Sequence, residues 1–153
     1  MIRVVFVCHG NICRSTLAQS VFTHMVKTGG VADKFFIDSM ATSTEEIGSP
    51  PHPGTVRKLY EAGIPVVPHS AKQITRADYG RFDYIICMDE RNVRALWRIL
   101  GADPEGKVYK LLSFAGTERD IADPWYSGNF DATFSDVYKG CEALLEYFNK
   151  NGI

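Results

Sequence analysis

Residues 4–15 of the chain read VVFVCHGNICRS, and this stretch predicts a strand, a loop and the first turn of a helix. Val4 to Val7 is continuously apolar and rich in β-branched residues, as is typical of a strand covered on both faces. After Ser15, apolar side chains recur at helical spacing until Gly29 and Gly30 end the pattern. The opening of the chain is therefore expected to be a strand, a loop and a helix.

The same alternation continues along the chain, which contains no internal repeat and no linker. Thr16 and Gln19 have the spacing of a capping box for the first helix, and Asp89 is placed to cap a later one. Trp97 and Tyr138 fall on the apolar stripes of the last two helical patterns. Further strands are expected at 35–40, 84–88 and 108–112, and helices around 56–63, 93–100 and 134–148.

Strands that alternate with helices predict an α/β fold. We expect a single domain over residues 1–153, with an open parallel four-stranded sheet, helices on both faces and a phosphate-binding loop after the first strand. With 153 residues, 45% of them apolar and 23% charged, the composition is that of an ordinary globular protein.

The charge and the cysteines narrow the class of protein. A net charge of −1 gives no reason to expect nucleic acid or an anionic membrane as a partner. No stretch approaches the roughly 18 apolar residues of a membrane-spanning helix, and the opening apolar run is too short for a signal peptide. Because the cysteine spacing fits neither a zinc ribbon nor a small disulfide scaffold, free thiols in a reducing cytoplasm are expected. The four cysteines are Cys8, Cys13, Cys87 and Cys141.

The loop from Cys8 to Ser15 has the position of an oxyanion site. Ligands of open α/β sheets bind beyond the carboxyl ends of the strands, and a helix N-terminus offers free N–H groups there. Arg14 adds a guanidinium that matches phosphate oxygens, and Cys8 is expected to be a thiolate nucleophile in the same field. On these two residues alone a buried structural Cys8 and a solvated Arg14 explain the pattern equally well.

A second segment, far along the chain, contains a candidate proton donor and aromatic side chains, which the Cys8 loop does not have. It reads ADPWYSG at residues 122–128 and is expected to be a loop after the fourth strand. Departure of a phenolate from an aryl phosphate needs a proton, which the carboxyl group of Asp123 could supply. Trp125 and Tyr126 could flank the aromatic ring of such a substrate. Asp-Pro is also a common turn dipeptide, so Asp123 becomes a candidate only together with the Cys8 loop.

With both segments, the sequence resembles the low-molecular-weight protein tyrosine phosphatase family over nearly its whole length. Residues 7–15 are similar to the family's N-terminal phosphate loop, and residues 38–39 with 48–53 to its second loop. His69, residues 71–75, residues 82–89 and Asp123-Pro124 follow in the family's order and spacing.

The resemblance implies hydrolysis through a phosphocysteine, without metal or cofactor. Cys8 would be the nucleophile, Arg14 would bind the phosphoryl oxygens and Asp123 would be the acid and then the base. Ser39 and His69 would support the loop. The residues expected to line or hold the substrate are His9, Gly10, Asn11, Ile12, Cys13, Ser15, Trp125 and Tyr126.

The resemblance also implies partners and a form of regulation. The substrate would be a phosphotyrosine-containing protein or a small aryl phosphate, with inorganic phosphate or another oxyanion as product or inhibitor. The chain would be a monomer or weak dimer that binds neither nucleic acid nor membrane. In this family the second loop cysteine, here Cys13, can form a disulfide with the nucleophile, which predicts redox sensitivity.

The sequence departs from the family pattern at three positions. His9 stands where an apolar residue is frequent, and Thr16 where proline is usual. Glu45, followed by Glu46, replaces an aromatic residue of the pocket wall, which removes a stacking surface and leaves the substrate preference open.

Other functions remain as alternatives. An arsenate reductase would need a close pair of downstream cysteines, which the chain lacks. An arginine phosphatase typically has threonine where this chain has Ile12, and a binding module without turnover would not need Cys8, Arg14 and Asp123 together. Nucleotide binding is unsupported because no glycine-rich nucleotide motif is present.

Overall fold

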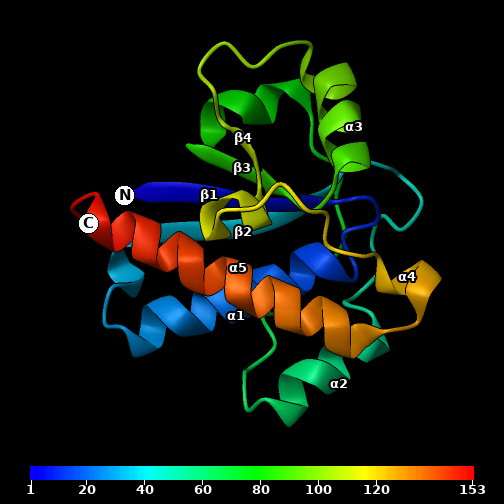
Figure 1. Cartoon of the computed structure of the whole chain (residues 1–153). Coiled ribbons are helices and arrows are strands. Elements are labelled where there is room, and N and C mark those ends of the chain that lie inside the picture. The colour runs from blue at the N-terminus through cyan, green and yellow to red at the C-terminus, as the bar shows by residue number, and fades with distance from the viewer.

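The computed structural model of the chain describes residues 1–153. Its four strands form one parallel sheet, so the predicted open parallel four-stranded sheet is confirmed (Figure 1). In spatial order β2-β1-β3-β4, the first strand of the chain lies inside the sheet and pairs with both β2 and β3. The bounds are β1 Ile2–Cys8, β2 Phe35–Ala41, β3 Tyr84–Cys87 and β4 Val108–Lys110.

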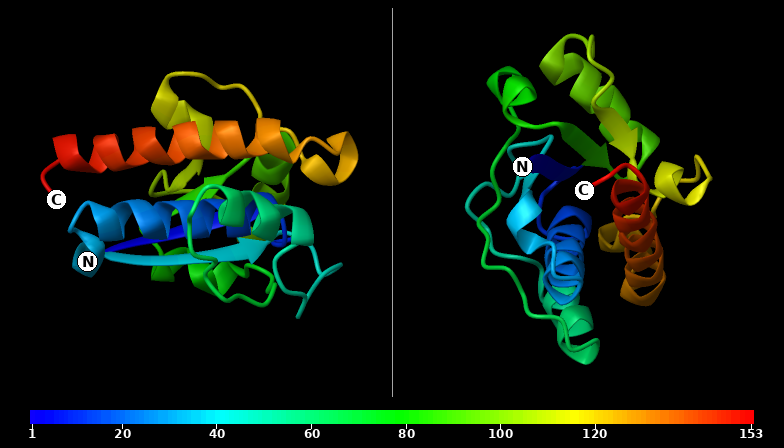
Figure 2. Two further views of the ribbon diagram at one scale, coloured as in Figure 1. Left: turned by 90° about the horizontal axis from the view of Figure 1, so that it is seen from below. Right: turned by 90° about the vertical axis from the view of Figure 1, so that its left-hand side faces the viewer.

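Helices cover both faces of the sheet, as predicted, with α1 and α5 on one side and α3 on the other (Figure 1). Both chain termini lie at the end of the molecule opposite α4 (Figure 2). None of the helices combines the length and apolar composition required to cross a bilayer. The α-helices are α1 Arg14–Thr28, α2 Pro53–Glu61, α3 Glu90–Leu100, α4 Pro124–Ser127 and α5 Phe130–Lys150, and the 3₁₀ helices are η1 Ala32–Lys34, η2 Arg76–Arg81 and η3 Leu111–Ala115.

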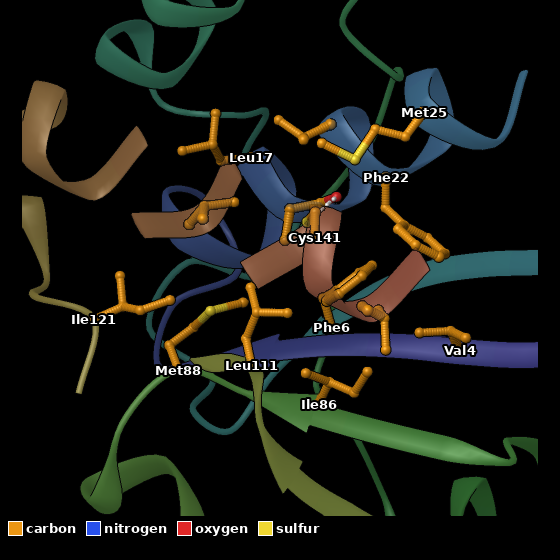
Figure 3. Close-up of a cluster of buried hydrophobic side chains, with 14 of the residues drawn as sticks. Val4, Phe6, Leu17, Phe22, Met25, Ile86, Met88, Leu111, Ile121 and Cys141 are labelled. Atoms are coloured by element: carbon orange, nitrogen blue, oxygen red, sulfur yellow. Dashed lines mark hydrogen bonds between the residues drawn. The ribbon is translucent and has the colours of Figure 1, made fainter. Parts of the chain in front are cut away.

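The alternation of side chains along β1 divides the core into two layers. Val4 and Phe6 point to the side of α1 and α5, where they pack with Phe22 and other apolar side chains (Figure 3). Val5 and Val7 point to the side of α3 and contact the second cluster. Because all four side chains are fully buried, β1 is fixed from both faces, and the loop that follows it has a rigid base.

The start of α1 differs from the prediction. The helix begins at Arg14 with Cys13 at its N-cap and has no side-chain cap, so the predicted capping box of Thr16 and Gln19 is wrong. Thr16 lies within the first turn, and its hydroxyl donates back to the carbonyl oxygens of Ile12 at 2.8 Å and Cys13 at 3.2 Å. The Thr16 hydroxyl of the helix therefore holds two carbonyl groups of the preceding loop in place.

Later elements also depart from the sequence pattern. β4 ends at Lys110, because Leu111 and Leu112 turn into η3, where both are buried. Trp97 and Tyr138, which the periodicity places on inner faces, are 47% and 38% exposed. In α3 and α5 the buried stripe is therefore narrower than the apolar pattern of the sequence. The cap at Asp89 is confirmed, since its carboxylate accepts a bond from the Asn92 amide at 2.8 Å.

One close approach ties α5 to the segment that leads to Asp123. A Cβ atom at Gly140 would lie 2.5 Å from the Cγ atom of Leu111 in η3, so only glycine allows this contact without displacement. Glycine inside a helix costs about 1 kcal/mol relative to alanine. The helix bears this cost because glycine at position 140 lets η3 pack closely against α5.

Candidate active site

The loop from Cys8 to Arg14 lies between the carboxyl end of β1 and the N-terminus of α1, as predicted. Asn11, with φ of 58°, is the one non-glycine residue of the chain in the left-handed region. A non-glycine residue in this region costs roughly 1 kcal/mol or more, and it persists where the surroundings hold it. The loop is thus bent into a tight curve that must be stabilised by its neighbours.

The completely buried side chain of Asn11 provides that stabilisation. Its Nδ2 donates to the hydroxyl oxygens of Ser15 at 2.8 Å and Ser39 at 2.9 Å. Its Oδ1 accepts from the backbone amide of Lys72 at 3.2 Å and lies 2.7 Å from Nε2 of His69. Ser39 and His69, which the sequence proposes as supports of the loop, are therefore both in contact with Asn11.

The protonation of His69 follows from this arrangement. Burial lowers the pKa of His69 below its usual value. The Asp38 carboxylate would raise that pKa, but the effect of burial is larger. The imidazole is therefore neutral near pH 7, and Nε2 must carry the hydrogen to donate to Asn11 Oδ1. His69 acts as a fixed donor at the base of the loop.

The hydroxyl of Ser15 connects this network to the sulfur of Cys8. The two side-chain atoms lie 3.1 Å apart in a buried environment. Asn11 already donates to the same Ser15 oxygen, so the Ser15 hydrogen is free to point at the sulfur. When Cys8 is a thiolate, Ser15 therefore donates a hydrogen bond to it.

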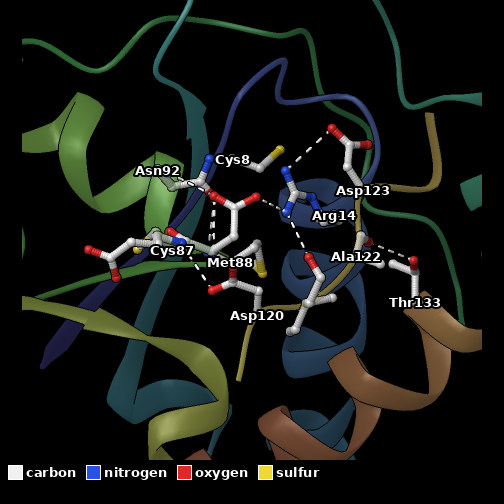
Figure 4. Close-up of polar contacts among 12 residues, drawn as sticks. Cys8, Arg14, Cys87, Met88, Asn92, Asp120, Ala122, Asp123 and Thr133 are labelled. Carbon is white, nitrogen blue, oxygen red and sulfur yellow. Dashed lines mark hydrogen bonds and ion pairs between the residues drawn. The ribbon is translucent and has the colours of Figure 1, made fainter. Parts of the chain in front are cut away.

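Arg14 links the loop to two distant segments, although only 2% of the side chain is exposed. Nη1 donates to Oδ2 of Asp89 at 2.6 Å and to the carbonyl oxygen of Ile121 at 2.8 Å, and Nη2 lies 3.4 Å from Oδ2 of Asp123 (Figure 4). Burial would lower the pKa of Arg14, but the negative charges of Cys8, Asp89 and Asp123 outweigh it and raise that pKa. The guanidinium is thus fixed in direction and charged.

Asp89 is a site residue that the sequence reading assigned only to capping. One carboxylate oxygen caps α3 and the other binds Arg14. The position of Asp89 in the fold is what brings it to the site. Asp89 follows the carboxyl end of β3, and β3 pairs with β1, which leads into the Cys8 loop. The spatial order of the strands is needed to see that these two ends meet.

Several anchors hold the segment that carries Asp123. The amide of Ile121 donates to the carbonyl oxygen of Met88 at 2.9 Å. The hydroxyl of Thr133 in α5 donates to the carbonyl oxygen of Ala122 at 2.9 Å (Figure 4). Asp123 itself caps α4, a short helix in the segment predicted to be a loop, by accepting from the Trp125 amide at 3.0 Å. Its second oxygen is left to face Arg14.

These segments enclose a hollow of about 310 Å³ at the mouth of the loop. Four predicted residues, Asn11, Ser15, Ser39 and His69, do not line it, and their side chains form the hydrogen-bond network that holds the loop. The structure gathers no group of three or more His, Cys, Asp or Glu side chains that could hold a metal ion. The predicted residues that line the hollow are Cys8, His9, Gly10, Ile12, Cys13, Arg14, Asp123, Trp125 and Tyr126.

The lining of the hollow includes both aromatic and acidic side chains. Trp125 and Tyr126 are exposed, and the Trp125 ring meets His52 edge-on at 5.9 Å between centroids. Glu45 and Glu46 also line the hollow, and Oε2 of Glu45 lies 2.5 Å from Nε2 of His9. The two departures at positions 9 and 45 therefore form one contact, which the sequence did not reveal.

The other cysteines differ from Cys8 in their surroundings. Burial, together with the charge of Cys8, raises the pKa of Cys13 to about 12, so that thiol is protonated at neutral pH. Cys87 and Cys141 are fully buried, and burial raises the pKa of each thiol. Their positions in β3 and on the inner face of α5 indicate a structural role.

Comparisons with known proteins agree with this geometry. The family described as low molecular weight phosphotyrosine protein phosphatase matches residues 3–152. The low molecular weight protein-tyrosine-phosphatase YfkJ of Bacillus subtilis is 37% identical over 98% of this chain and 97% of its own length. The rat enzyme named low molecular weight phosphotyrosine protein phosphatase is 40% identical over 94% and 93%.

Solved structures extend the comparison to the fold. The crystal structure of YfkJ superposes with a TM-score of 0.95 and covers 100% of this chain and 98% of that one, at 36% identity. A Drosophila protein described as an arginine phosphatase, DARP, superposes with a TM-score of 0.86 at 26% identity, covering 96% of this chain and 98% of its own. The same fold thus occurs in proteins named for two kinds of phosphatase.

Proposed function

The chain belongs to the low molecular weight phosphotyrosine protein phosphatase family, and we propose that it hydrolyses phosphotyrosine and other aryl phosphates through a phosphocysteine on Cys8. The observation that carries this proposal is the position of Arg14, whose buried side chain lines the hollow together with Cys8 and lies 3.4 Å from Asp123. The nucleophile Cys8, the oxyanion-binding Arg14 and the acid Asp123 therefore line the same hollow. Residues 1–153 would form a single phosphatase domain.

In the first step the thiolate of Cys8 attacks phosphorus in line with the departing phenolate oxygen. The sulfur–phosphorus bond forms as the phosphorus–oxygen bond breaks, and Asp123 protonates the leaving phenolate. Arg14 and the backbone amides of the loop hold the three equatorial oxygens, where charge is concentrated in the transition state. Because Asn11 fixes the loop before substrate binds, these donors need little rearrangement.

In the second step water hydrolyses the phosphocysteine. Asp123, now a carboxylate, takes a proton from water as its oxygen attacks phosphorus, and the thiolate of Cys8 leaves. The Ser15 hydroxyl, 3.1 Å from the sulfur, stabilises the departing charge. The product is inorganic phosphate, which occupies the same donors and is therefore expected to compete with substrate.

Substrate chemistry is tested by comparing a phosphotyrosine peptide with a phosphoarginine peptide in the presence of EDTA. We expect phosphate release from phosphotyrosine at undiminished rate in EDTA and little release from phosphoarginine. Ile12, an apolar side chain in the lining of the hollow, supports the preference for a phenyl ring over a guanidinium. A high wild-type rate on phosphoarginine would establish the alternative instead, and Ile12→Thr would then have little further effect.

Redox control of the same loop is part of the proposal. Peroxide would oxidise the Cys8 thiolate to a sulfenic acid, and the Cys13 sulfur would displace its hydroxyl group as water to give a disulfide. Both cysteines line the same hollow, which supports the pairing. Burial and the charge of Cys8 raise the pKa of Cys13, and conversion of the Cys8 thiolate to an uncharged sulfenic acid removes the second of these two causes.

Intact mass after mild peroxide treatment tests this pairing. We expect the loss of two hydrogens with loss of activity, and recovery of both after a thiol reductant is added. Direct addition of two or three oxygens to Cys8, with no loss of hydrogen, would contradict it.

The predicted cellular setting remains part of the proposal. All four cysteines are free thiols in this structure, which supports a reducing cytoplasm as the location. A monomer or weak dimer remains the expected oligomeric state.

A further inference from the structure

A second hollow, of about 150 Å³, lies beside the active site on the side of α3. It shares His9, Arg14, Asp123 and Tyr126 with the first hollow, so the two adjoin at these four residues. A substrate whose phosphotyrosine occupies the first hollow therefore passes the entrance of the second.

One face of α3 makes the second hollow basic. Arg91, Ala95 and Arg98 line it at spacings of four and three residues, which puts them on the same side of the helix. The small side chain of Ala95 leaves space between the two guanidinium groups. The arginines stand about 10 Å apart along the helix axis, and each can reach toward the space between them.

These two charges are not neutralised within the chain. Neither Arg91 nor Arg98 forms any of the ion pairs of the structure. The two carboxylates that line the hollow, Asp89 and Asp123, are both directed to Arg14. The hollow therefore presents two exposed guanidinium groups with donors available.

The charge is distributed unevenly around the active site. Glu45 and Glu46 line the first hollow, and neither lines the second. A negative group on the substrate is repelled by these two carboxylates and attracted toward Arg91 and Arg98. The field thus gives a bound peptide a preferred direction.

We propose that the hollow at Arg91 and Arg98 binds a second anionic group of the substrate, a carboxylate or a second phosphate, next to the phosphotyrosine. The guanidinium fork matches the oxygens of both groups. Because the hollows adjoin and an extended peptide advances about 3.3–3.6 Å per residue, the group lies within a few residues of the phosphotyrosine. This inference rests on the proposed function and names the class of phosphopeptide that it acts on.

The experiment compares kcat/KM for phosphotyrosine peptides that differ only in their flanking residues, which are alanine, lysine, glutamate or phosphoserine. The test variant is Arg91→Gln/Arg98→Gln. The control variant is Arg57→Gln/Arg94→Gln, which removes the same charge from two exposed arginines that line neither hollow. Turnover of p-nitrophenyl phosphate, which has no second anionic group, is measured for each protein.

We expect wild type and control to prefer the acidic peptides over the alanine peptide by roughly tenfold, as two partly exposed ion pairs allow. The test variant should lose most of that preference while its p-nitrophenyl phosphate turnover changes less than about twofold, since Arg91 and Arg98 take no part in the chemistry. The glutamate and phosphoserine arms distinguish a carboxylate from a second phosphate as the better ligand.

An equal loss of preference in the control variant would assign the effect to overall charge and overturn the proposal, as would a wild type with no preference. Binding of the same peptides to Cys8→Ser protein is measured in parallel. Absence of phosphotyrosine turnover would contradict the proposed function, whereas the binding series still decides whether Arg91 and Arg98 recognise the second anion.

Discussion

Replacement of Cys8 by serine is expected to lower kcat for p-nitrophenyl phosphate by about four orders of magnitude or more, the scale seen when an enzyme loses its nucleophile. A serine hydroxyl stays protonated at neutral pH. The first step uses Asp123 as an acid and not as a base, and the neutral His69 lies behind the loop bonded to Asn11, so neither would ionise the serine. Phosphate release in EDTA measures the effect.

The control for this variant is retention of the oxyanion site. The Asn11 network does not depend on the sulfur, so Cys8→Ser protein should still bind inorganic phosphate, seen as a rise in Tm with phosphate concentration. If Cys8→Ser protein turned over substrate at the wild-type rate with this binding intact, the nucleophile would have to be another group.

Replacement of Asp123 by alanine is expected to lower kcat for a phosphotyrosine peptide by about 10²–10⁴-fold, the usual contribution of a general acid. The loss should be smaller for p-nitrophenyl phosphate, because p-nitrophenolate is a better leaving group and needs the proton less. The dependence of kcat on the leaving group therefore separates an acid from a residue that only orients Arg14.

Asp120→Asn is the matched control for Asp123→Ala. Asp120 belongs to the same segment, but its carboxylate accepts from the Glu90 amide and the Lys110 ammonium and does not line the active-site hollow. Its replacement should leave turnover within a few-fold of wild type. Equal losses in the two variants, or equal losses of Asp123→Ala on both substrates, would assign Asp123 a structural role.

Local patterns predicted the part of the site that lies in one stretch of sequence. The strand before Cys8 and the helix after Arg14 are both readable because buried apolar residues keep their periodicity on either side of the loop. The order of Asp123, Trp125 and Tyr126 in one short segment made the acid and its aromatic neighbours recognisable as a unit. The three line the hollow together.

Contacts between segments could not be predicted in the same way. The pairing of Arg14 with Asp89 depends on β3 lying next to β1, which the order of strands along the chain does not specify. The contact of His9 with Glu45 joins two side chains 36 positions apart. Trp97 looked buried because periodicity gives the direction of a side chain but not the width of the surface that covers it.

The reach of Arg14 has a consequence for synthesis of the protein. Its bonds to Asp89, Ile121 and Asp123 span 75, 107 and 109 residues. Contacts of such long range form late, since the intervening chain must first be ordered. A nascent chain emerges N-terminus first, so Cys8 is synthesised well before Asp89, Ile121 and Asp123. Until those residues have emerged, the phosphate loop lacks the partners that hold its guanidinium, so catalytic competence cannot precede them.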